Sequence, residues 1–441
     1  MPASLRAIAC ALTLCAGALA GCQPLRTVGE TVQDDAHPPQ SWRPLSGAEQ
    51  SAFDLGYAVF NTEWVPANSP AGRIDGLGPL FNSQGCDACH NSRRRGRGPG
   101  GNGEAPSDLV IQLGRLLPDG SVRRGTDEYG YVLNTAAIKG FSPEAKVWIQ
   151  YDERLETLAD GPAIRLRQPR YRADHLSGPP LPPHTVLMPR LPPPVQGPGL
   201  LELVPRAELL RIAQSQRQNT LAVRGRIAWL DATTIGRFGW QATEPSVASQ
   251  VANAFSREMG LTTTLVSHID CGGGDVACAT AATGGSPEVE PVLFDAVVAF
   301  QRLHSVPLQR VTDESAQGAH LFRHVGCADC HREALPVATS DTTRTVIHPY
   351  TDLLVHDMGA GLADRDIEGE PVRSQWRTAP LWGMHAAVVT DQPLRLLHDG
   401  RARSVEEAIA WHDGEGGGAR AAFMHLSAQQ RRELVLWIDA L

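Results

Sequence analysis

Apolar residues recur at helical spacing in several separate segments of the chain. Between Ser46 and Trp64, for example, Phe53, Tyr57 and Phe60 fall on one face, because positions three or four apart lie side by side on a helix. The same spacing predicts further helices at 207–212, 246–259, 292–300, 316–322, 404–412 and 427–441. The last two begin with serine-containing sequences that are typical of helix N-terminal caps. The pattern predicts a mainly α fold.

A different pattern occupies the region from about 105 to 235. Short β-like pieces occur at 109–113 and 147–151, and nine prolines lie between Gly178 and Pro198. We expect the proline-rich part to be an extended, stiff connector, because proline favours that conformation over a helix. The region is predicted to be a long irregular insert that contains β-structure.

Composition narrows the class of protein. The chain has 441 residues, of which 42% are hydrophobic and 20% charged. This length exceeds that of most single cores, so two domains are the default. The composition excludes a wholly disordered chain and gives no sign of a multi-span membrane protein. A net charge of -8 argues against nucleic acid as a partner, because non-specific binding to nucleic acid needs a basic surface.

The N-terminal segment has the pattern of a secretion signal. A positive charge precedes an apolar run at 7–18 that is too short to span a membrane. The run leads to a Leu-Ala-Gly-Cys sequence that resembles the bacterial lipobox and ends at Cys22. We expect residues 1–21 to be removed, Cys22 to be acylated and residues 22–45 to form a tether of an exported, periplasm-facing bacterial lipoprotein. Gln23, which directly follows the cysteine, favours transport of the lipoprotein to the outer membrane. An ordinary signal peptide with a chance cysteine is the alternative.

Two Cys-x-x-Cys-His motifs carry the strongest chemical signal. They consist of Cys86, Cys89 and His90, and of Cys327, Cys330 and His331. Two thiols three positions apart on a helical turn can each add to a haem vinyl group, and the following imidazole can bind the iron. A zinc site would need four ligands around one ion, and a redox cysteine pair does not need the histidine. The sequence therefore predicts two covalently bound haem c groups.

The remaining cysteines of the exported part are Cys271 and Cys278, which flank a glycine-rich turn. In an oxidising compartment we expect them to form a disulfide. A reactive redox pair is the alternative.

The order of motifs and helices predicts the domain organisation. A haem-binding motif followed at a distance by a terminal amphipathic helix is the outline of a cytochrome c domain. We expect an N-terminal cytochrome c-like domain at 46–285, interrupted by the insert at about 105–235, and a C-terminal cytochrome c-like domain at 286–441.

Further motifs resemble those of the di-haem cytochrome c peroxidase and MauG-like superfamily. The superfamily motifs lie at 397–401 and 404–409; more specific segments, at 76–82, 236–240, 349–359, 376–383 and 410–414, resemble the di-haem oxidoreductase branch, also called thiol oxidoreductases. The resemblance covers about 45–441. It implies a peroxidase-like enzyme, with peroxide or substrate chemistry at the N-terminal haem and electron transfer through the C-terminal haem.

The resemblance also implies catalytic residues. In the superfamily a tryptophan lies between the haems, and a glutamine and a glutamate line the distal pocket. Trp240, Gln250 and Glu258 fall at similar spacing here. A positioned carboxylate can take a proton from one peroxide oxygen and deliver it to the other, which is the role expected of Glu258. The alternatives are a solvent-facing Gln and Glu on an ordinary helix, and a tryptophan that only packs in the core.

The resemblance also points to a sixth ligand for the C-terminal haem. Counting forward from His398 gives His412, which lies on the apolar face of a short helix, where an unpaired imidazole would be costly. Met358, Met384 and His356 are its rivals. Ligation by two imidazoles would give a lower potential than ligation by histidine and methionine.

The sixth ligand of the N-terminal haem stays open. No histidine follows His90 until His175. The first haem is therefore either open or water-bound, or it is capped from the insert by His175, His184 or Met188.

Two further features of the sequence each leave more than one interpretation open. A calcium site between the domains is disfavoured, because Pro393 and Arg395 stand where the superfamily has a threonine and a proline. The arginine run at 93–97 is interpreted as a solvated basic loop, and the alternative is a docking patch for haem propionates or for an acidic redox partner.

The expected electron donor is a small redox protein or a quinol-linked donor, with membrane contact through the lipid anchor. A non-catalytic electron carrier and a redox accessory in iron acquisition are the competing functions. Thiol oxidation has little support, because Cys271 and Cys278 are the only spare cysteine pair.

Overall fold

The computed structural model describes residues 26–27, 30–31 and 39–441, except 71–73, 91–93, 220–221, 340–344 and 389–391. The predicted signal peptide, Cys22 and most of the tether lie outside the described residues. Among the helices that are described, none combines the length and the apolar character needed to cross a membrane.

The fold is mixed, and the predicted mainly α class is wrong. Among the described residues, helices account for 30% and strands for 22%. The hairpin of β10 and β11 explains part of the error, because these strands pair along their whole length yet expose many charged side chains that mask the apolar alternation. Many other strands have only two or three residues, which is too short for a period of two to be recognised.

Several helices begin at residues that cap them. Ser46 and Ser427 each accept a hydrogen bond from the backbone of the third helical residue, whose side chain accepts one in return. At α10 the Ser404 side chain also accepts from the Glu407 N–H. The helices are α1 Gly47–Phe60, α2 Cys86–His90, α3 Pro198–Glu202, α4 Arg206–Gln218, α5 Val247–Met259, α6 Val276–Ala279, α7 Pro291–Leu303, α8 Asp313–His324, α9 Met384–Val388, α10 Val405–Ala410, α11 Gly417–Met424 and α12 Ala428–Asp439, with 3₁₀ turns at Cys327–Asp329 and Gly414–Gly416.

The strands form one five-stranded sheet and several smaller ones. The larger strands are β7 Val110–Leu116, β10 Lys146–Thr157, β11 Ala163–Asp174 and β12 Thr185–Arg190. The short strands are β1 Arg26–Thr27, β2 Glu30–Thr31, β3 Val65–Pro66, β4 Asp75–Leu77, β5 Leu80–Phe81, β6 Gly103–Glu104, β8 Val122–Arg124, β9 Ala136–Ala137, β13 Val306–Pro307, β14 Leu335–Val337, β15 Thr345–Ile347, β16 Val355–Asp357, β17 Asp364–Asp366, β18 Pro371–Arg373 and β19 Gln375–Arg377.

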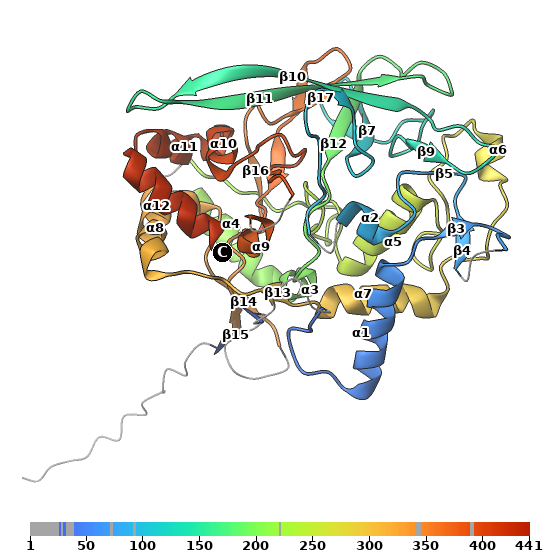
Figure 1. The fold of residues 1–441 in the computed structure, drawn as a ribbon, viewed down its shortest axis with the longest axis horizontal. Coiled ribbons are helices and arrows are strands. Elements are labelled where there is room, and N and C mark those ends of the chain that lie inside the picture. The colour runs from blue at the N-terminus through green and yellow to red at the C-terminus, as the bar shows by residue number, and fades with distance from the viewer. Residues whose placement is uncertain are drawn as a thin grey trace, which may run out of the picture.

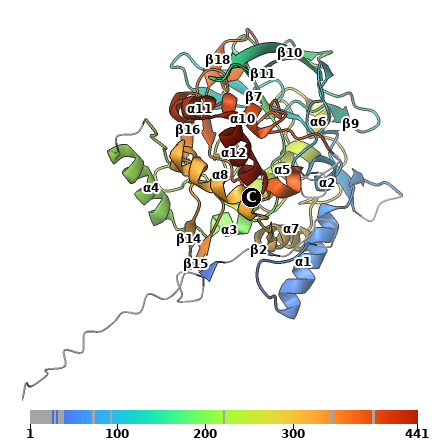
Figure 2. The same cartoon turned by 60° about the vertical axis from the view of Figure 1, so that its left-hand side comes forward.

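Two groups of helices lie on opposite sides of the molecule (Figure 1). One group contains α1, α2, α5 and α7, and the other contains α8, α10, α11 and α12; the β10–β11 hairpin runs above them, as Figure 2 also shows. Each group has its own apolar core, the first around Phe255 and Phe294 and the second around Phe322 and Trp437. The domain boundaries stay a prediction. Helix α7 lies within the predicted C-terminal domain, yet it packs against α1 and α5 of the N-terminal half.

The insert is joined to the C-terminal half by the five-stranded sheet. Its order is β18-β17-β12-β7-β8, so β12 of the insert pairs with β17. A buried ion pair crosses the same boundary, with Arg190 donating from both terminal nitrogens to the Asp364 carboxylate at 2.7 Å. Such a paired, bidentate contact fixes the orientation of the two segments. The insert is therefore part of the framework of the C-terminal site.

Candidate functional site

The second Cys-x-x-Cys-His motif borders a cavity of 570 Å³. Cys327 and Cys330 lie at its wall together with His331, which directly follows them, and His412, which lies two residues after the end of α10. The wall also contains apolar side chains from Phe322, Leu362, Leu381, Leu396, Val405, Ala408, Ile409 and Ile438. A largely apolar cavity of this size, with a few convergent polar groups, is typical of a cofactor site.

Both histidines of this cavity are held in the same way. His331 Nδ1 donates to the Tyr350 carbonyl at 2.9 Å, and His412 Nδ1 donates to the Ala408 carbonyl at 2.8 Å. Burial lowers the pKa of His331 to about 4 and also lowers that of His412. Each imidazole is therefore neutral, with the Nδ1 proton fixed and the Nε2 lone pair left to bind a metal, as in metal-binding histidines.

The thiols of both motifs are unoxidised in the structure. Burial raises the pKa of Cys327, Cys86 and Cys89 to about 12 and also raises that of Cys330. Because the thiolate is the reactive form, these thiols are poor redox catalysts at neutral pH. Addition of the thiols to haem vinyl groups fits this environment better than a redox role.

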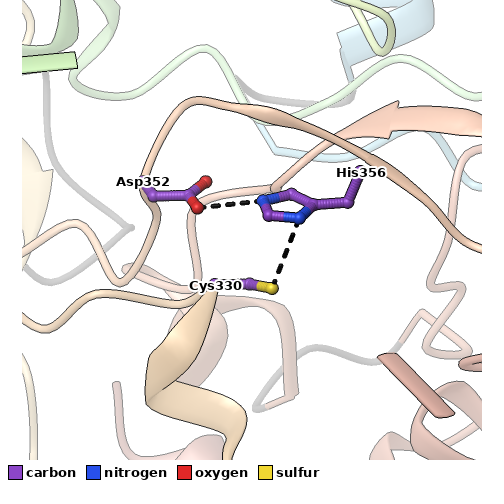
Figure 3. Close-up of side chains that lie close together, drawn as sticks. All are labelled: Cys330, Asp352 and His356. Atoms are coloured by element: carbon purple, nitrogen blue, oxygen red, sulfur yellow. Dashed lines mark hydrogen bonds and ion pairs between the residues drawn. The ribbon is translucent and has the colours of Figure 1, made fainter. Parts of the chain in front are cut away.

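His356, a rival ligand, is engaged on both ring nitrogens. Its Nε2 contacts Asp352 at 2.9 Å, its Nδ1 contacts Glu415 at 2.8 Å, and Cys330 Sγ lies 3.7 Å from the same Nδ1. Burial disfavours charge on His356, but Asp352 and Glu415 outweigh it and raise its pKa well above the usual value. Figure 3 shows Cys330, Asp352 and His356 converging. A protonated His356 between two carboxylates has no lone pair for iron.

Met358 and Met384 line the same cavity as His412. The structure thus brings all three rivals to the cavity wall. Met358 and Met384 remain alternatives as the sixth ligand, whereas both ring nitrogens of His356 are engaged. His398, from which the ligand position was counted, also lines the cavity. Its ring stacks on Trp376 with 3.8 Å between the centroids, and burial lowers its pKa to about 3.

The first motif lies on α2 and repeats the histidine arrangement of the second. His90 Nδ1 donates to the Pro193 carbonyl at 2.9 Å, and burial lowers the pKa of His90 to about 4. The Phe60 ring of α1 lies 6.0 Å from the His90 ring between centroids. Both motifs therefore present a neutral imidazole whose Nδ1 proton is fixed by a backbone carbonyl.

Glu258, at the end of α5, lies beside the first motif. Asn82 and Ser83 donate backbone N–H bonds to the Glu258 carbonyl at 2.8 and 3.1 Å, and Asn82 Nδ2 donates to Glu258 Oε2 at 3.4 Å. The Glu258 carboxylate also interacts electrostatically with Cys89. Burial raises the pKa of Glu258 to about 7. A carboxyl group with this pKa can both accept and release a proton near neutral pH.

Gln250 and Trp240 lie toward the second site. A Cβ added at Gly239 would be 3.7 Å from Gln250 Oε1, so Gln250 lies beside the turn that carries Trp240. Gln250 Oε1 is buried and has no hydrogen-bond partner among the described residues. Trp240 borders the cavity. The structure thus places Glu258 and Gln250 at different ends of α5, about 12 Å apart along the helix.

A short piece of the insert connects the two sites. The Leu191 carbonyl accepts a hydrogen bond from Trp240 Nε1 at 2.8 Å, and the Leu191 N–H donates to the His398 carbonyl at 2.7 Å. Pro193, which binds His90, follows two residues later. The segment Leu191–Pro193 therefore contacts both sites, which the sequence did not indicate beyond its proline content.

The remaining predicted positions are separate from these contacts. Cys271 and Cys278 are joined by a disulfide. A ring nitrogen of His184 lies within 4.8 Å of carboxylate oxygens of Asp366 and Glu368. Met188 is buried in β12.

At the position where the superfamily has its calcium site, the Arg395 guanidinium donates to the carbonyls of Pro99 and Leu394 at 2.8 and 2.9 Å. Carbonyl oxygens are among the ligands that calcium prefers. Here the two carbonyl oxygens accept hydrogen bonds from a cationic side chain instead.

A family model described as "Di-haem oxidoreductase, putative peroxidase" matches residues 132–441. This range contains the second motif, α5 and all the residues that line the cavity except Arg95, whereas the first motif lies upstream of it. Neither a curated protein nor a solved structure gives a significant match. The match covers most of the chain and confirms the resemblance seen in its motifs: the protein belongs to the di-haem oxidoreductase family, whose cofactors are haems.

Proposed function

We propose that this protein is a lipid-anchored, peroxidase-like oxidoreductase with two haem c groups, attached through Cys86 and Cys89 and through Cys327 and Cys330. The observation that carries the proposal is the repeated arrangement of His90 and His331, each neutral, half-buried and bound through Nδ1 to a backbone carbonyl. When bound, the haem irons supply one-electron chemistry and a binding site for peroxide. The protein residues hold the cofactors, orient them and move protons.

The two sites have different tasks in this proposal. The C-terminal cavity contains a second imidazole, His412, prepared in the same way as His331. His331 and His412 would together hold the haem iron of this site, an arrangement that would suit electron transfer. The N-terminal motif is paired with an acid, Glu258, and is assigned the reaction with peroxide.

Glu258 acts as the proton-transfer group. In its ionised form the carboxylate accepts a proton from the peroxide oxygen nearest the metal, and it then donates that proton to the leaving oxygen. Its pKa of about 7 makes both steps accessible at neutral pH. The hydrogen bond from Asn82 Nδ2 orients the carboxylate. Gln250 lies at the other end of α5 and is assigned a supporting role beside Trp240.

Trp240 is the proposed electron relay between the sites. Its indole borders the C-terminal cavity, and its Nε1–H is bound by Leu191 of the segment that also binds His90. An indole held in this position borders the C-terminal site and is linked to the N-terminal site through that segment.

The electron donor is proposed to be a small redox protein or a quinol-linked donor at the periplasmic side of the outer membrane, where acylated Cys22 anchors the chain. Replacement of Cys22 by alanine should release the protein from the membrane fraction and abolish incorporation of labelled fatty acid. Retention of the label in the variant would contradict the anchor.

The test of the function uses optical and electron paramagnetic resonance spectra of the ferric protein before and after one equivalent of hydrogen peroxide. We expect one high-spin and one low-spin haem, with the high-spin signal consumed by peroxide. Two low-spin signals that peroxide leaves unchanged, also after half-reduction, would indicate an electron carrier and would remove the roles of Glu258 and Gln250. A protein mass that lacks two haems would contradict covalent attachment.

A further inference from the structure

Four arginines line the C-terminal cavity, and they differ in their partners. Arg323 forms an ion pair with Glu333, and Arg420 forms one with Glu156. For Arg95 and Arg377 there is no ion pair with a carboxylate among the described residues. Two positively charged side chains at an apolar cavity are therefore without an anionic partner in contact, which is unfavourable unless a ligand supplies one.

Arg95 extends from the first haem motif to this second cavity. It follows His90 by five positions in the sequence, yet its Nη1 donates to the Leu397 carbonyl at 3.3 Å. Its guanidinium lies over the Trp240 ring, 5.5 Å from the centroid. Its Nε is buried without a hydrogen-bond partner among the described residues. A solvated basic loop would leave this nitrogen in water, so that interpretation does not hold for Arg95.

Arg377 approaches the cavity from β19. Its Nε donates to the Gly239 carbonyl at 3.0 Å, and its backbone N–H donates to the Trp240 carbonyl at 2.9 Å. Burial lowers the pKa of Arg377 to about 10, with Asp352 partly offsetting the effect, and burial lowers that of Arg95 to about 10. Both guanidinium groups remain charged at neutral pH. Together they flank the turn that carries Trp240.

We propose that Arg95 and Arg377 bind the two propionate carboxylates of the C-terminal haem. A haem carries two such groups, and guanidinium is the side chain best suited to bind carboxylates through paired hydrogen bonds. The inference rests on the proposed placement of a haem in this cavity. It assigns to Arg95, which lies five residues after the first motif, a direct contact with the second cofactor, next to the proposed relay Trp240.

The proposed contact affects the redox equilibrium of the C-terminal haem. Propionates that remain unpaired in an apolar site stabilise the more positive, ferric form of the nearby iron through Coulomb attraction. Arg95 removes part of this effect by neutralising one carboxylate. Loss of the Arg95 guanidinium should therefore lower the reduction potential of the C-terminal haem.

The experiment compares Arg95→Gln, Arg95→Lys and the wild-type holoprotein by spectroelectrochemical titration. Arg377 is not used, because it also holds the Gly239–Trp240 turn. The control is Arg172→Gln, which removes a charge from an ion pair on the exposed hairpin, where the arginine side chain is 71% accessible. We expect Arg95→Gln to make reduction of the C-terminal haem about tenfold less favourable, which is about 59 mV for one electron. Lysine should restore part of the shift, and the control should cause none.

Haem content separates the two ways in which the experiment can fail. If pyridine haemochrome analysis finds two haems per chain and Arg95→Gln leaves the C-terminal potential at the wild-type value, the propionate contact is refuted and the proposed function stands. If the wild-type protein holds only one haem, both are refuted. An equal shift in Arg172→Gln would show that the effect is a general response to net charge, and it would also refute the contact.

Discussion

Replacing Glu258 by glutamine tests the proton-transfer role and the burial of this carboxyl group at once. The change keeps the size and the hydrogen-bonding capacity of the side chain and removes its charge. Burial raises the pKa of Glu258 from 4.5 to about 7, so the folded protein holds this proton more tightly than the unfolded chain does. Ionisation therefore costs stability, and the cost grows as the pH rises through this window.

The size of the effect follows from the pKa shift. One pKa unit corresponds to about 1.4 kcal/mol. The contribution of Glu258 to the free energy of unfolding of the wild-type protein should therefore fall by about 2 to 3 kcal/mol between about pH 5 and about pH 8. The Gln variant has no ionisation at this position. Its free energy of unfolding relative to the wild type should therefore increase by that amount over the same interval, as measured by denaturant unfolding of the holoproteins.

The same variant should lose activity where the wild type is active. The carboxylate is the required base, so the wild-type rate of peroxide-dependent oxidation of a reduced donor should rise with pH through about 7. Glu258→Gln should lower this rate by about 100-fold or more and abolish the pH dependence near 7. Glu63→Gln, at an exposed position, removes the same charge and should change neither property. The reasoning is refuted if the Gln variant retains wild-type turnover and the stability difference does not change with pH.

Three further changes test the cavity. Replacing His412 by alanine should convert the C-terminal haem from low-spin to high-spin in electron paramagnetic resonance spectra, and an unchanged low-spin signal would assign the ligand to a methionine. Replacing Cys330 by serine should leave one thioether bond at this haem, seen as a shifted haemochrome band; an unshifted band would contradict attachment at this cysteine. Replacing His356 by glutamine should destabilise the protein by about 3 kcal/mol or more near pH 6, because Asp352 and Glu415 lose their buried cation. Since the pKa of His356 is raised, this contribution is complete below about pH 6.5 and is lost only as the pH rises through the raised value; denaturant unfolding showing no loss near pH 6 would refute it.

The sequence predicted the helices better than the sheets. Amphipathic spacing located α1, α5, α7, α8 and α12, because each of these helices has enough turns for the pattern to repeat. The short helix α10 was located by its capping sequence at Ser404 as well. The five-stranded sheet was missed, since β12 pairs with β17 from a segment far away in the chain. Such long-range pairing has no local signature.

The candidate site likewise has parts that the sequence predicted and parts that it did not. The spacing within the two Cys-x-x-Cys-His motifs could be read directly. His412 was singled out by the resemblance and by its expected place on an apolar helix face. In the structure it lies just after α10 and at the cavity wall, and its role as a ligand stays a prediction. Arg95 was visible only as part of a basic run, and Arg377 only as part of a family segment. Their shared cavity depends on tertiary contacts that no sequence spacing describes.

The segment Leu191–Pro193 has a mechanical consequence. Leu191 binds Trp240, and Pro193 binds His90, so these two side chains are attached to backbone positions no more than roughly 7 Å apart. Two consecutive prolines fix φ within this span, so thermal motion can alter the separation very little. Because the rate of electron tunnelling falls steeply with distance, a rigid spacer gives every molecule nearly the same transfer rate. In the proposed function, the segment Leu191–Pro193 is thus a rigid spacer between Trp240 and His90. Shortening this segment by one residue would change the distance between its two ends.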